Sequence, residues 1–324
     1  MPKTGLVIGK FYPPHRGHRY LIDTAAAQVD HLIVLACEKP GQSMSGAQRV
    51  RWLRELHPEV DVRIIPDIGH DDDSKIWADY TQQFLGFAPD VVFTSEKYGP
   101  TYASFMGSRH VMVDLARATV PISATKVRNN PWAYWQFLEP CVRSYLAKRI
   151  CVLGAESTGT TTQAQALADT YHTVWVPEYG RTYSEEKYRS NSRPTWTSDE
   201  FVYIAKEQQR QENEAARRAN RLLICDTNAF ATGIWHERYM GYRSELVEHI
   251  GTERQPDIYL LTDDTIPFVQ DGVRDGEHLR HWMHGLFQQR LNEQSVPWQL
   301  ITGDRSKRLR QAQQVIDRLY TTTH

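Results

Sequence analysis

The sequence has few cysteines, no long apolar run and almost no net charge. Its four cysteines, Cys37, Cys141, Cys151 and Cys225, lie far apart in the 324 residues. Such spacing favours buried thiols over disulfides or a metal site. No apolar run approaches the roughly twenty residues that span a bilayer, and the N-terminus lacks the apolar core of a signal peptide. We therefore expect a cytoplasmic protein with no membrane partner.

The charge balance and the length narrow the class further. The formal net charge is -1, so the total gives no reason to expect a nucleic-acid partner. The length suggests about two domains. The sequence leaves the oligomeric state open, a homo-oligomer included.

The first half of the chain alternates between strand and helix patterns. This alternation predicts a parallel, doubly wound α/β sheet that binds ligands at the carboxyl ends of its strands. The predicted strands are Leu6–Gly9, His31–Ala36, Val62–Ile65, Val91–Thr94 and His110–Val113, and the predicted helices lie near Gly17–Gln28, Ala47–Leu56, Ile76–Leu85 and Tyr98–Met106.

The first predicted strand runs into the loop Gly9-Lys10-Phe11-Tyr12-Pro13-Pro14-His15-Arg16-Gly17-His18. His15 and His18 would lie where a helix N-terminus opens, which favours a polyphosphate. Their imidazole N–H groups, with Lys10 as a mobile cation, could neutralise the charge on a phosphoryl group during transfer. Gly17 would let the backbone come close to a nucleotide. Taken alone, the motif fits a plain strand-to-helix turn equally well.

A second motif, Ile122-Ser123-Ala124-Thr125-Lys126-Val127-Arg128, follows Pro121. It offers two hydroxyls and two cations within about two helical turns. At another helix N-terminus it could bind the β- and γ-phosphates of ATP from the far side.

Together the two motifs, G-K-F-x-P-x-H-x-G-H and I-S-x-T-x-x-R, resemble the adenylyltransferase domain of the bifunctional nicotinamide-mononucleotide adenylyltransferase/ribosylnicotinamide kinase family. The resemblance continues through Ile65–Ile68, Trp77 and Pro131–Trp135. It implies that ATP and nicotinamide mononucleotide are joined, with Mg²⁺, to give NAD and pyrophosphate. The implied catalytic residues are His15, His18, Lys10 and Arg128, and the implied nucleotide-binding residues are Gly9, Phe11, Gly17, Arg49, Ser123 and Thr125.

Two of these assignments have plain structural alternatives. Arg49 could reach a nucleotide phosphate, as the corresponding arginine does in related adenylyltransferases, or it could be a solvated helix charge. Trp77 could stack on the nicotinamide ring, or it could be a core aromatic residue. The acidic run Asp71–Asp73 is better explained as a loop and helix cap than as a metal site.

A second nucleotide-binding motif follows a predicted domain boundary, which separates residues 1–148 from 149–324. The strand Arg149–Leu153 enters Gly154-Ala155-Glu156-Ser157-Thr158-Gly159-Thr160-Thr161, which has P-loop spacing. The usual P-loop lysine is replaced by Thr160, which should weaken nucleotide binding and catalysis. Thr161 could still bind Mg²⁺.

The second half resembles the kinase domain of the same family. Glu178 could hold the ribose hydroxyls of ribosylnicotinamide while Tyr179 borders its ring. Asp226 ends an apolar run and could act through Mg²⁺ or as a base. Arg274 or Arg280 could close over phosphates and offset the missing lysine. The predicted nucleotide-binding residues here are Gly154, Ser157, Gly159, Thr160, Thr161 and Arg274.

Other functions remain open at this point. The second domain could be a non-catalytic nucleotide sensor attached to a monofunctional adenylyltransferase, and Thr160 favours this alternative. The H-x-G-H motif also occurs in pantetheine-phosphate, flavin and cytidylyl transferases. It occurs in class I aminoacyl-tRNA synthetases too, but no K-M-S-K-S-like loop or basic tRNA-binding domain is visible. The first strand begins almost at Met1, where some family members carry a helix-turn-helix segment, so we do not expect transcriptional regulation.

Overall fold

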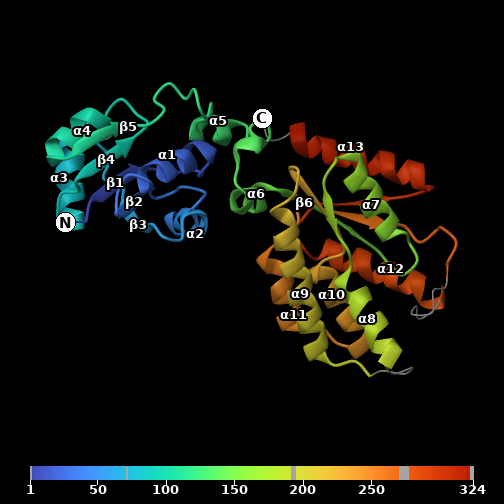
Figure 1. Ribbon diagram of the computed structural model, residues 1–324. Helices are drawn as coiled ribbons and strands as arrows, with labels where there is room; N and C mark the ends of the chain where they lie inside the picture. The colour runs from blue at the N-terminus through green and yellow to red at the C-terminus, as the bar shows by residue number, and fades with distance from the viewer. Residues whose placement is uncertain (1, 71, 191–194, 270–276, 322–324) are drawn as a thin grey trace. The chain divides into compact units, whose positions relative to one another are not determined.

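The computed structural model describes residues 2–70, 72–190, 195–269 and 277–321 (Figure 1). Contacts within the chain divide it into two compact units, Met1–Val142 and Arg143–His324. The division falls inside helix α6 (Pro140–Leu146), a few residues before the boundary expected from the sequence.

The first unit is built on a five-stranded parallel sheet with the order β3-β2-β1-β4-β5. The predicted strands and helices of this half are therefore confirmed, with ends that shift by a residue or two. Its elements are β1 (Thr4–Gly9), α1 (Arg16–Ala26), β2 (His31–Glu38), α2 (Gly46–Leu56), β3 (Asp61–Pro66), α3 (Ser74–Leu85), β4 (Val91–Thr94), α4 (Gly99–Met106), β5 (Arg109–Met112), α5 (Ala124–Asn129), the 3₁₀ turn η1 (Trp135–Phe137) and the start of α6.

Alternation along the strands separates the two layers of helices in this unit. Val7 on β1 faces α1 and α2, where it belongs to the same buried cluster as Ile22 and Leu53. Leu6 faces the opposite way, into a cluster with Tyr102 of α4 and other residues of α3 and α4. Successive strand residues point to opposite faces, so both faces of the sheet are covered and the strands read as nearly continuous apolar runs.

The strand order reverses direction beside β1. The chain moves from β1 to β2 and β3 on one side, and then returns to place β4 and β5 on the other. In doubly wound sheets the loops that leave such a point diverge, and a crevice forms outside the carboxyl ends of the strands. The loop that carries the two predicted catalytic histidines starts at this point.

The second unit is also built on a five-stranded parallel sheet, with the order β10-β9-β6-β8-β7. The strand that precedes the predicted P-loop, β6, is the central one. The elements are β6 (Lys148–Leu153), α7 (Thr160–Thr170), β7 (Val174–Val176), α8 (Tyr179–Ser190), α9 (Ser198–Ala216), β8 (Leu222–Asp226), α10 (Ala229–Met240), α11 (Glu245–Glu253), β9 (Ile258–Thr262), α12 (Glu277–Asn292), β10 (Trp298–Ile301) and α13 (Arg305–Thr321).

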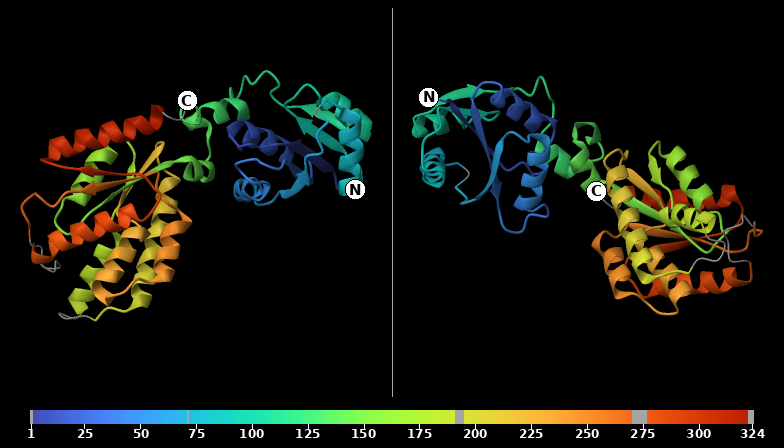
Figure 2. Two further views of the ribbon diagram at one scale, coloured as in Figure 1. Left: turned by 180° about the vertical axis from the view of Figure 1, so that it is seen from behind. Right: turned by 60° about the horizontal axis from the view of Figure 1, so that its bottom comes forward.

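Helices also cover both faces of this second sheet, as Figure 2 shows. Ile150 and Ile224 of the sheet share a buried cluster with Leu167 of α7 and Ile316 of α13. A separate apolar cluster joins α9, α10 and α11. This is the two-layered covering that a parallel sheet needs.

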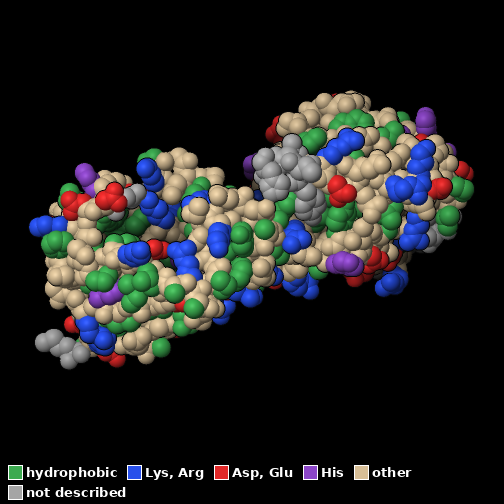
Figure 3. Space-filling view, turned by 90° about the horizontal axis from the view of Figure 1, so that it is seen from above, with side chains coloured by type: hydrophobic (Ala, Val, Ile, Leu, Met, Phe, Trp, Pro, Cys, Tyr) green, Lys and Arg blue, Asp and Glu red, His purple; other side chains and the backbone are tan. Residues whose placement is uncertain are grey.

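Several expectations about composition can be checked in the part of the chain that the structure describes. All four cysteines are buried free thiols, as predicted. Among the described residues no helix is both long and apolar enough to cross a membrane. On the face seen in Figure 3, basic and acidic side chains are interspersed over both units.

Candidate active sites

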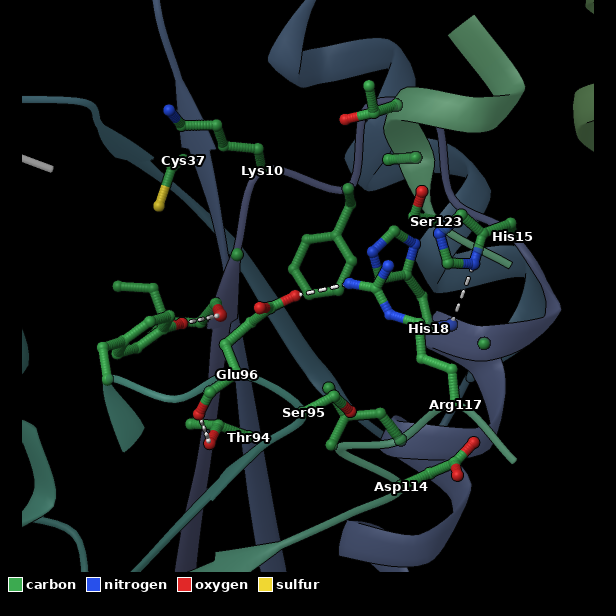
Figure 4. Close-up of a pocket in the computed structure, with 18 of the residues that line it drawn as sticks. Lys10, His15, His18, Cys37, Thr94, Ser95, Glu96, Asp114, Arg117 and Ser123 are labelled. Atoms are coloured by element: carbon green, nitrogen blue, oxygen red, sulfur yellow. Dashed lines mark hydrogen bonds and ion pairs between the residues drawn. The ribbon is translucent and has the colours of Figure 1, made fainter. Parts of the chain in front are cut away.

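A cavity of about 400 Å³ opens where the strand order of the first sheet reverses. Its walls come from the loops after β1 and β4 and from the segment that leads into α5 (Figure 4). Pockets of this size suit small-molecule ligands. Nine of the predicted site residues line it: Gly9, Lys10, Phe11, His15, Gly17, His18, Trp77, Ser123 and Thr125.

The two histidines form a stacked pair on one wall of this cavity. His15 caps α1, because its Nδ1 atom accepts a hydrogen bond of 3.3 Å from the backbone N–H of His18. The two imidazole rings stack with centroids 3.7 Å apart. A Cβ atom on Gly17 would come within 3.1 Å of the His15 ring. Glycine at position 17 therefore leaves the His15 ring undisturbed, whereas a larger residue would push it by a few tenths of an ångström, a reason that its spacing in the motif did not reveal.

Burial makes both imidazoles poor bases. It lowers the pKa of His15 to about 4, with the positive charge of Arg117 as a smaller cause. Burial also lowers the pKa of His18 well below its ordinary value, and the charges of His15 and Arg117 add to the shift. Both rings are therefore neutral near pH 7. Because Nδ1 of His15 accepts a bond, its Nε2 atom carries the proton.

Two ring nitrogens of this pair have no partner within the described part of the chain. These are Nε2 of His15 and Nδ1 of His18, both buried. Buried polar atoms are almost always hydrogen-bonded, so these two atoms on a cavity wall leave hydrogen bonds that a bound ligand or water can make. The tautomer of His15 allows it to donate to an oxygen atom of that ligand.

Arg49 differs from its prediction as a phosphate ligand. Its side chain is fully buried beneath the histidine loop and does not line the cavity. The guanidinium donates to the carbonyl oxygens of Lys10 and, at 2.9 Å, of Cys37, and it also reaches Gln42 at 2.7 Å. Arg49 therefore joins the chain ends of β1 and β2. The position of a residue in a helix does not show whether its side chain enters the ligand cavity or is buried under the loop next to the cavity.

Lys10 lies across the cavity from the histidine pair in Figure 4, and Trp77 is a further residue of the cavity lining. The Nζ atom of Lys10 is 3.7 Å from the buried carboxylate of Asp67. The Trp77 indole donates a hydrogen bond of 2.8 Å to the carbonyl oxygen of Gly69. This bond fixes the ring in the cavity wall, and stacking on a ligand stays a prediction. Asp73 caps α3, as expected, through bonds from the backbone N–H groups of its first turn.

The second motif contributes hydroxyls to the cavity, while its arginine binds the histidine loop. Ser123 caps α5 by accepting a bond of 3.3 Å from Lys126 N–H. Arg128 donates to the carbonyl oxygen of Tyr12 at 2.6 Å and to the Thr125 hydroxyl at 3.0 Å. The predicted catalytic Arg128 is not among the cavity-lining residues, so here it links α5 to the loop.

Sequence reasoning missed two charged residues in this cavity, Glu96 and Arg117. They form an ion pair of 2.8 Å that Figure 4 shows beside the histidine rings. Glu96 lies just beyond β4, at a carboxyl strand end next to the point of reversal, so the strand pattern contained a signal for it. Arg117 lies in an irregular loop, and no periodic pattern marks it.

In the second unit, the predicted P-loop connects β6 to α7 as expected. A Cβ atom on Gly154 would lie 2.2 Å from the Thr262 hydroxyl, so only glycine fits. Thr262 donates to the Thr158 hydroxyl at 2.7 Å, and Thr158 donates to the carbonyl oxygen of Ala155 at 2.7 Å. Gly159, with φ +82°, turns the chain into α7. These contacts shape the loop without the usual lysine.

Asp226 lies next to this loop because β8 pairs with β6. Its side chain is fully buried, and its Oδ2 atom accepts a 2.5 Å bond from Thr161. Burial raises the pKa of Asp226, while hydrogen bonds from Thr161 and Thr160 oppose the rise. The other oxygen, Oδ1, has no partner in the described residues. A hydroxyl and a free carboxylate oxygen side by side are the ligands that Mg²⁺ prefers.

Glu178 and Tyr179 open α8 at the neighbouring strand end. Burial, followed by the negative charge of Asp226, raises the pKa of Glu178 to about 8. The backbone N–H of Tyr179 donates to Gln208 at 2.8 Å, and its hydroxyl donates to that of Tyr203 at 3.3 Å. The predicted nucleoside-binding pair therefore lies close to the predicted metal-binding carboxylate.

The predicted cationic lid is only partly described. Arg274 lies outside the described residues. Arg280 donates to the carbonyl oxygens of Asp264 and Ile266 and so is bound to backbone. Arg308 of α13, which the sequence did not suggest, is buried and donates to the Thr158 carbonyl oxygen at 2.6 Å.

Comparisons with known families agree with this division into two nucleotide-binding units. Residues 6–130 match the cytidylyltransferase-like family, and residues 149–308 match an AAA domain family. The fold and the sites therefore define a nucleotidyltransferase-like domain followed by a P-loop domain.

Individual relatives show in more detail what the chain is similar to. It is 29% identical, over 83% of its length and 71% of the relative's, to the trifunctional NAD biosynthesis/regulator protein NadR of Escherichia coli (strain K12). It is 26% identical, over 41% of its length and 76% of the relative's, to the nicotinamide-nucleotide adenylyltransferase of Thermococcus onnurineus. A solved structure of NadR in complex with NAD and AMP-PNP shares the fold, with a TM-score of 0.75 and 20% identity over 100% of this chain and 96% of that one. Over most of its length, therefore, the chain is similar to NadR.

We predict that Arg49→Lys lowers the free energy of unfolding by about 2 kcal/mol or more, because lysine cannot pair with several carbonyl oxygens at once. Urea unfolding of the full chain measures the change. Arg51→Lys, on the same helix but exposed, is the matched control and should change little. Equal stability of the two variants would contradict the buried role of Arg49.

A second prediction concerns acid stability. Between about pH 6.5 and pH 4 the unfolded chain takes up a proton at His15 that the folded chain does not, so lowering the pH destabilises the fold by up to about 3 kcal/mol. His15→Asn keeps a capping oxygen and removes this proton uptake. The loss of stability from pH 6.5 to pH 4.5 should be smaller in this variant than in the wild type. His31→Asn, at an exposed position, should leave the loss unchanged.

Proposed function

We propose that the first unit transfers the adenylyl group of ATP to nicotinamide mononucleotide, forming NAD and pyrophosphate. A phosphate oxygen of the mononucleotide attacks the α-phosphorus of ATP, and the bond to the β-phosphate oxygen breaks. The stacked histidine pair carries this proposal, because its two unpartnered nitrogens lie on the wall of a nucleotide-sized cavity at the sheet reversal. The NadR and nicotinamide-nucleotide adenylyltransferase relatives support the choice of substrates.

The side chains would act by alignment and charge neutralisation. A neutral His15 would donate a hydrogen bond from its Nε2–H group to a phosphoryl oxygen. His18 would contact the same phosphoryl group from the adjacent ring. Lys10, which is half exposed, can leave Asp67 and follow the triphosphate. Such donors lower the barrier when they meet charge that develops in the transition state, with no covalent intermediate required.

We propose further that the second unit phosphorylates ribosylnicotinamide with ATP. Its P-loop would cradle the phosphates, and Thr161 with Asp226 would hold Mg²⁺, which neutralises charge on the transferred group. Asp226 or Glu178 would accept the proton of the ribose 5′-hydroxyl. The raised pKa of Glu178, about 8, keeps most of this group protonated near pH 7.

A different role for the second unit follows from Thr160. A P-loop without its lysine lacks the cation that bridges the β- and γ-phosphates. The Thr160 hydroxyl is neutral, so it does not replace that charge. The alternative is a unit that binds a nucleotide without turnover and regulates the first unit. A cytoplasmic location and the absence of a nucleic-acid partner stay predictions, and the oligomeric state stays open.

The experiment that separates these functions is a product assay with the purified chain, ATP and Mg²⁺, given nicotinamide mononucleotide or ribosylnicotinamide in separate reactions. We expect NAD from the first reaction. His18→Ala should reduce that rate by at least about a hundred-fold and leave any phosphorylation of ribosylnicotinamide intact. NAD synthesis that survives in His18→Ala would contradict the proposed site.

Restoring the P-loop lysine tests the role of the second unit. If the unit is a kinase, Thr160→Lys should raise its rate by about ten-fold or more, because the added cation stabilises the transferring phosphoryl group. Thr160→Ser, which keeps a hydroxyl and adds no charge, is the control. ATP binding without turnover in both the wild type and Thr160→Lys would support the sensor instead.

A further inference from the structure

The ion pair between Arg117 and Glu96 lies inside the cavity of the first unit. Both side chains line the cavity, and the Nη2 atom of Arg117 donates to the Oε1 atom of Glu96 at 2.8 Å. Arg117 lies beside the histidine rings in Figure 4. Its guanidinium therefore lies in the same part of the cavity as the unpartnered imidazole nitrogens.

The backbone around Arg117 is built to hold it there. Asp114 and Arg117 both have left-handed backbone angles, with φ +51° and +52°, which cost about 1 kcal/mol or more for residues other than glycine. The Asp114 carboxylate compensates by accepting bonds from the N–H groups of Ala118, Thr119 and Val120, at 2.7 to 3.1 Å. A strained turn that is held in this way at a cavity fixes the direction of the arginine.

Stability does not explain why the pair exists. The Arg117 and Glu96 side chains are 40% and 53% exposed, and ion pairs with that exposure contribute little to folding. The pairing has a chemical meaning instead, because a carboxylate presents two anionic oxygens to a guanidinium much as a phosphate does. Glu96 therefore pairs with the Arg117 guanidinium in the way that an anionic ligand would.

We propose that Arg117 is a phosphate-binding residue for the nucleotide in this cavity, and that Glu96 holds its guanidinium until a phosphate displaces the carboxylate. The inference rests on the proposed adenylyltransferase function, which supplies the nucleotide. Because the two histidines are neutral, Lys10 and Arg117 would supply the positive charge for the triphosphate in this cavity. A small positive charge limits how tightly the triphosphate is held. Because Glu96 competes with the ligand for Arg117, it weakens binding of the nucleotide.

The test measures KM for ATP and kcat for NAD formation by the full chain. Arg117→Gln should raise KM for ATP by about ten- to a hundred-fold, since a charge-assisted contact is lost, and Arg117→Lys should recover part of the loss. Glu96→Gln should lower KM for ATP a few-fold, because the ligand no longer displaces a charged partner. In an Arg117→Gln background, Glu96→Gln should have no further effect.

Arg63→Gln is the matched control, because Arg63 pairs with Asp61 on the exposed edge of the same unit. It should leave both constants unchanged. If Glu96→Gln raises KM as strongly as Arg117→Gln does, Glu96 itself binds substrate and the inference is wrong. It is also wrong if the Arg117 variants, folded by circular dichroism, form NAD with wild-type constants. A wild-type chain that forms no NAD would instead refute the proposed function.

Discussion

The buried guanidinium of Arg49 is the interaction on which the first site depends. It joins the carbonyl oxygens at the ends of β1 and β2, directly below the loop that carries the histidines. A buried charge is stabilised only when its donors are used, and here the backbone carbonyls use them. Arg49 therefore holds the loop on the side away from the cavity, while the stacked imidazoles line the cavity.

In the second unit a different buried arginine, Arg308, stabilises the nucleotide-binding loop. Arg308 lies buried next to its P-loop and donates to the carbonyl oxygen of Thr158 and to Asp263. In both units, then, an arginine that resembles a phosphate ligand in its chemistry serves to hold a nucleotide loop in shape. Both arginines are therefore used by the backbone around a nucleotide loop, and other side chains, such as Lys10 and Arg117 in the first unit, line the cavity.

The sequence was informative about secondary-structure elements and motifs, and less informative about where individual side chains point. Apolar periodicity located the strands of the first sheet, and turn chemistry located the caps, including that of Asp73. Periodicity does not report whether an arginine points above or below a loop, and for this reason Arg49 was assigned to the ligand. Arg117 was missed because its position depends on a left-handed turn and on a partner, Glu96, from a distant part of the chain.

The contact between Gly17 and the His15 ring has a consequence for how this loop can evolve. Any side chain at position 17 would press on the imidazole at 3.1 Å, so a substitution there acts on His15 and through it on His18. A change at this position is therefore coupled to its neighbours, because the His15 ring would have to shift by a few tenths of an ångström to admit a Cβ atom. The glycine and the two histidines of the motif are therefore linked because they share one small volume.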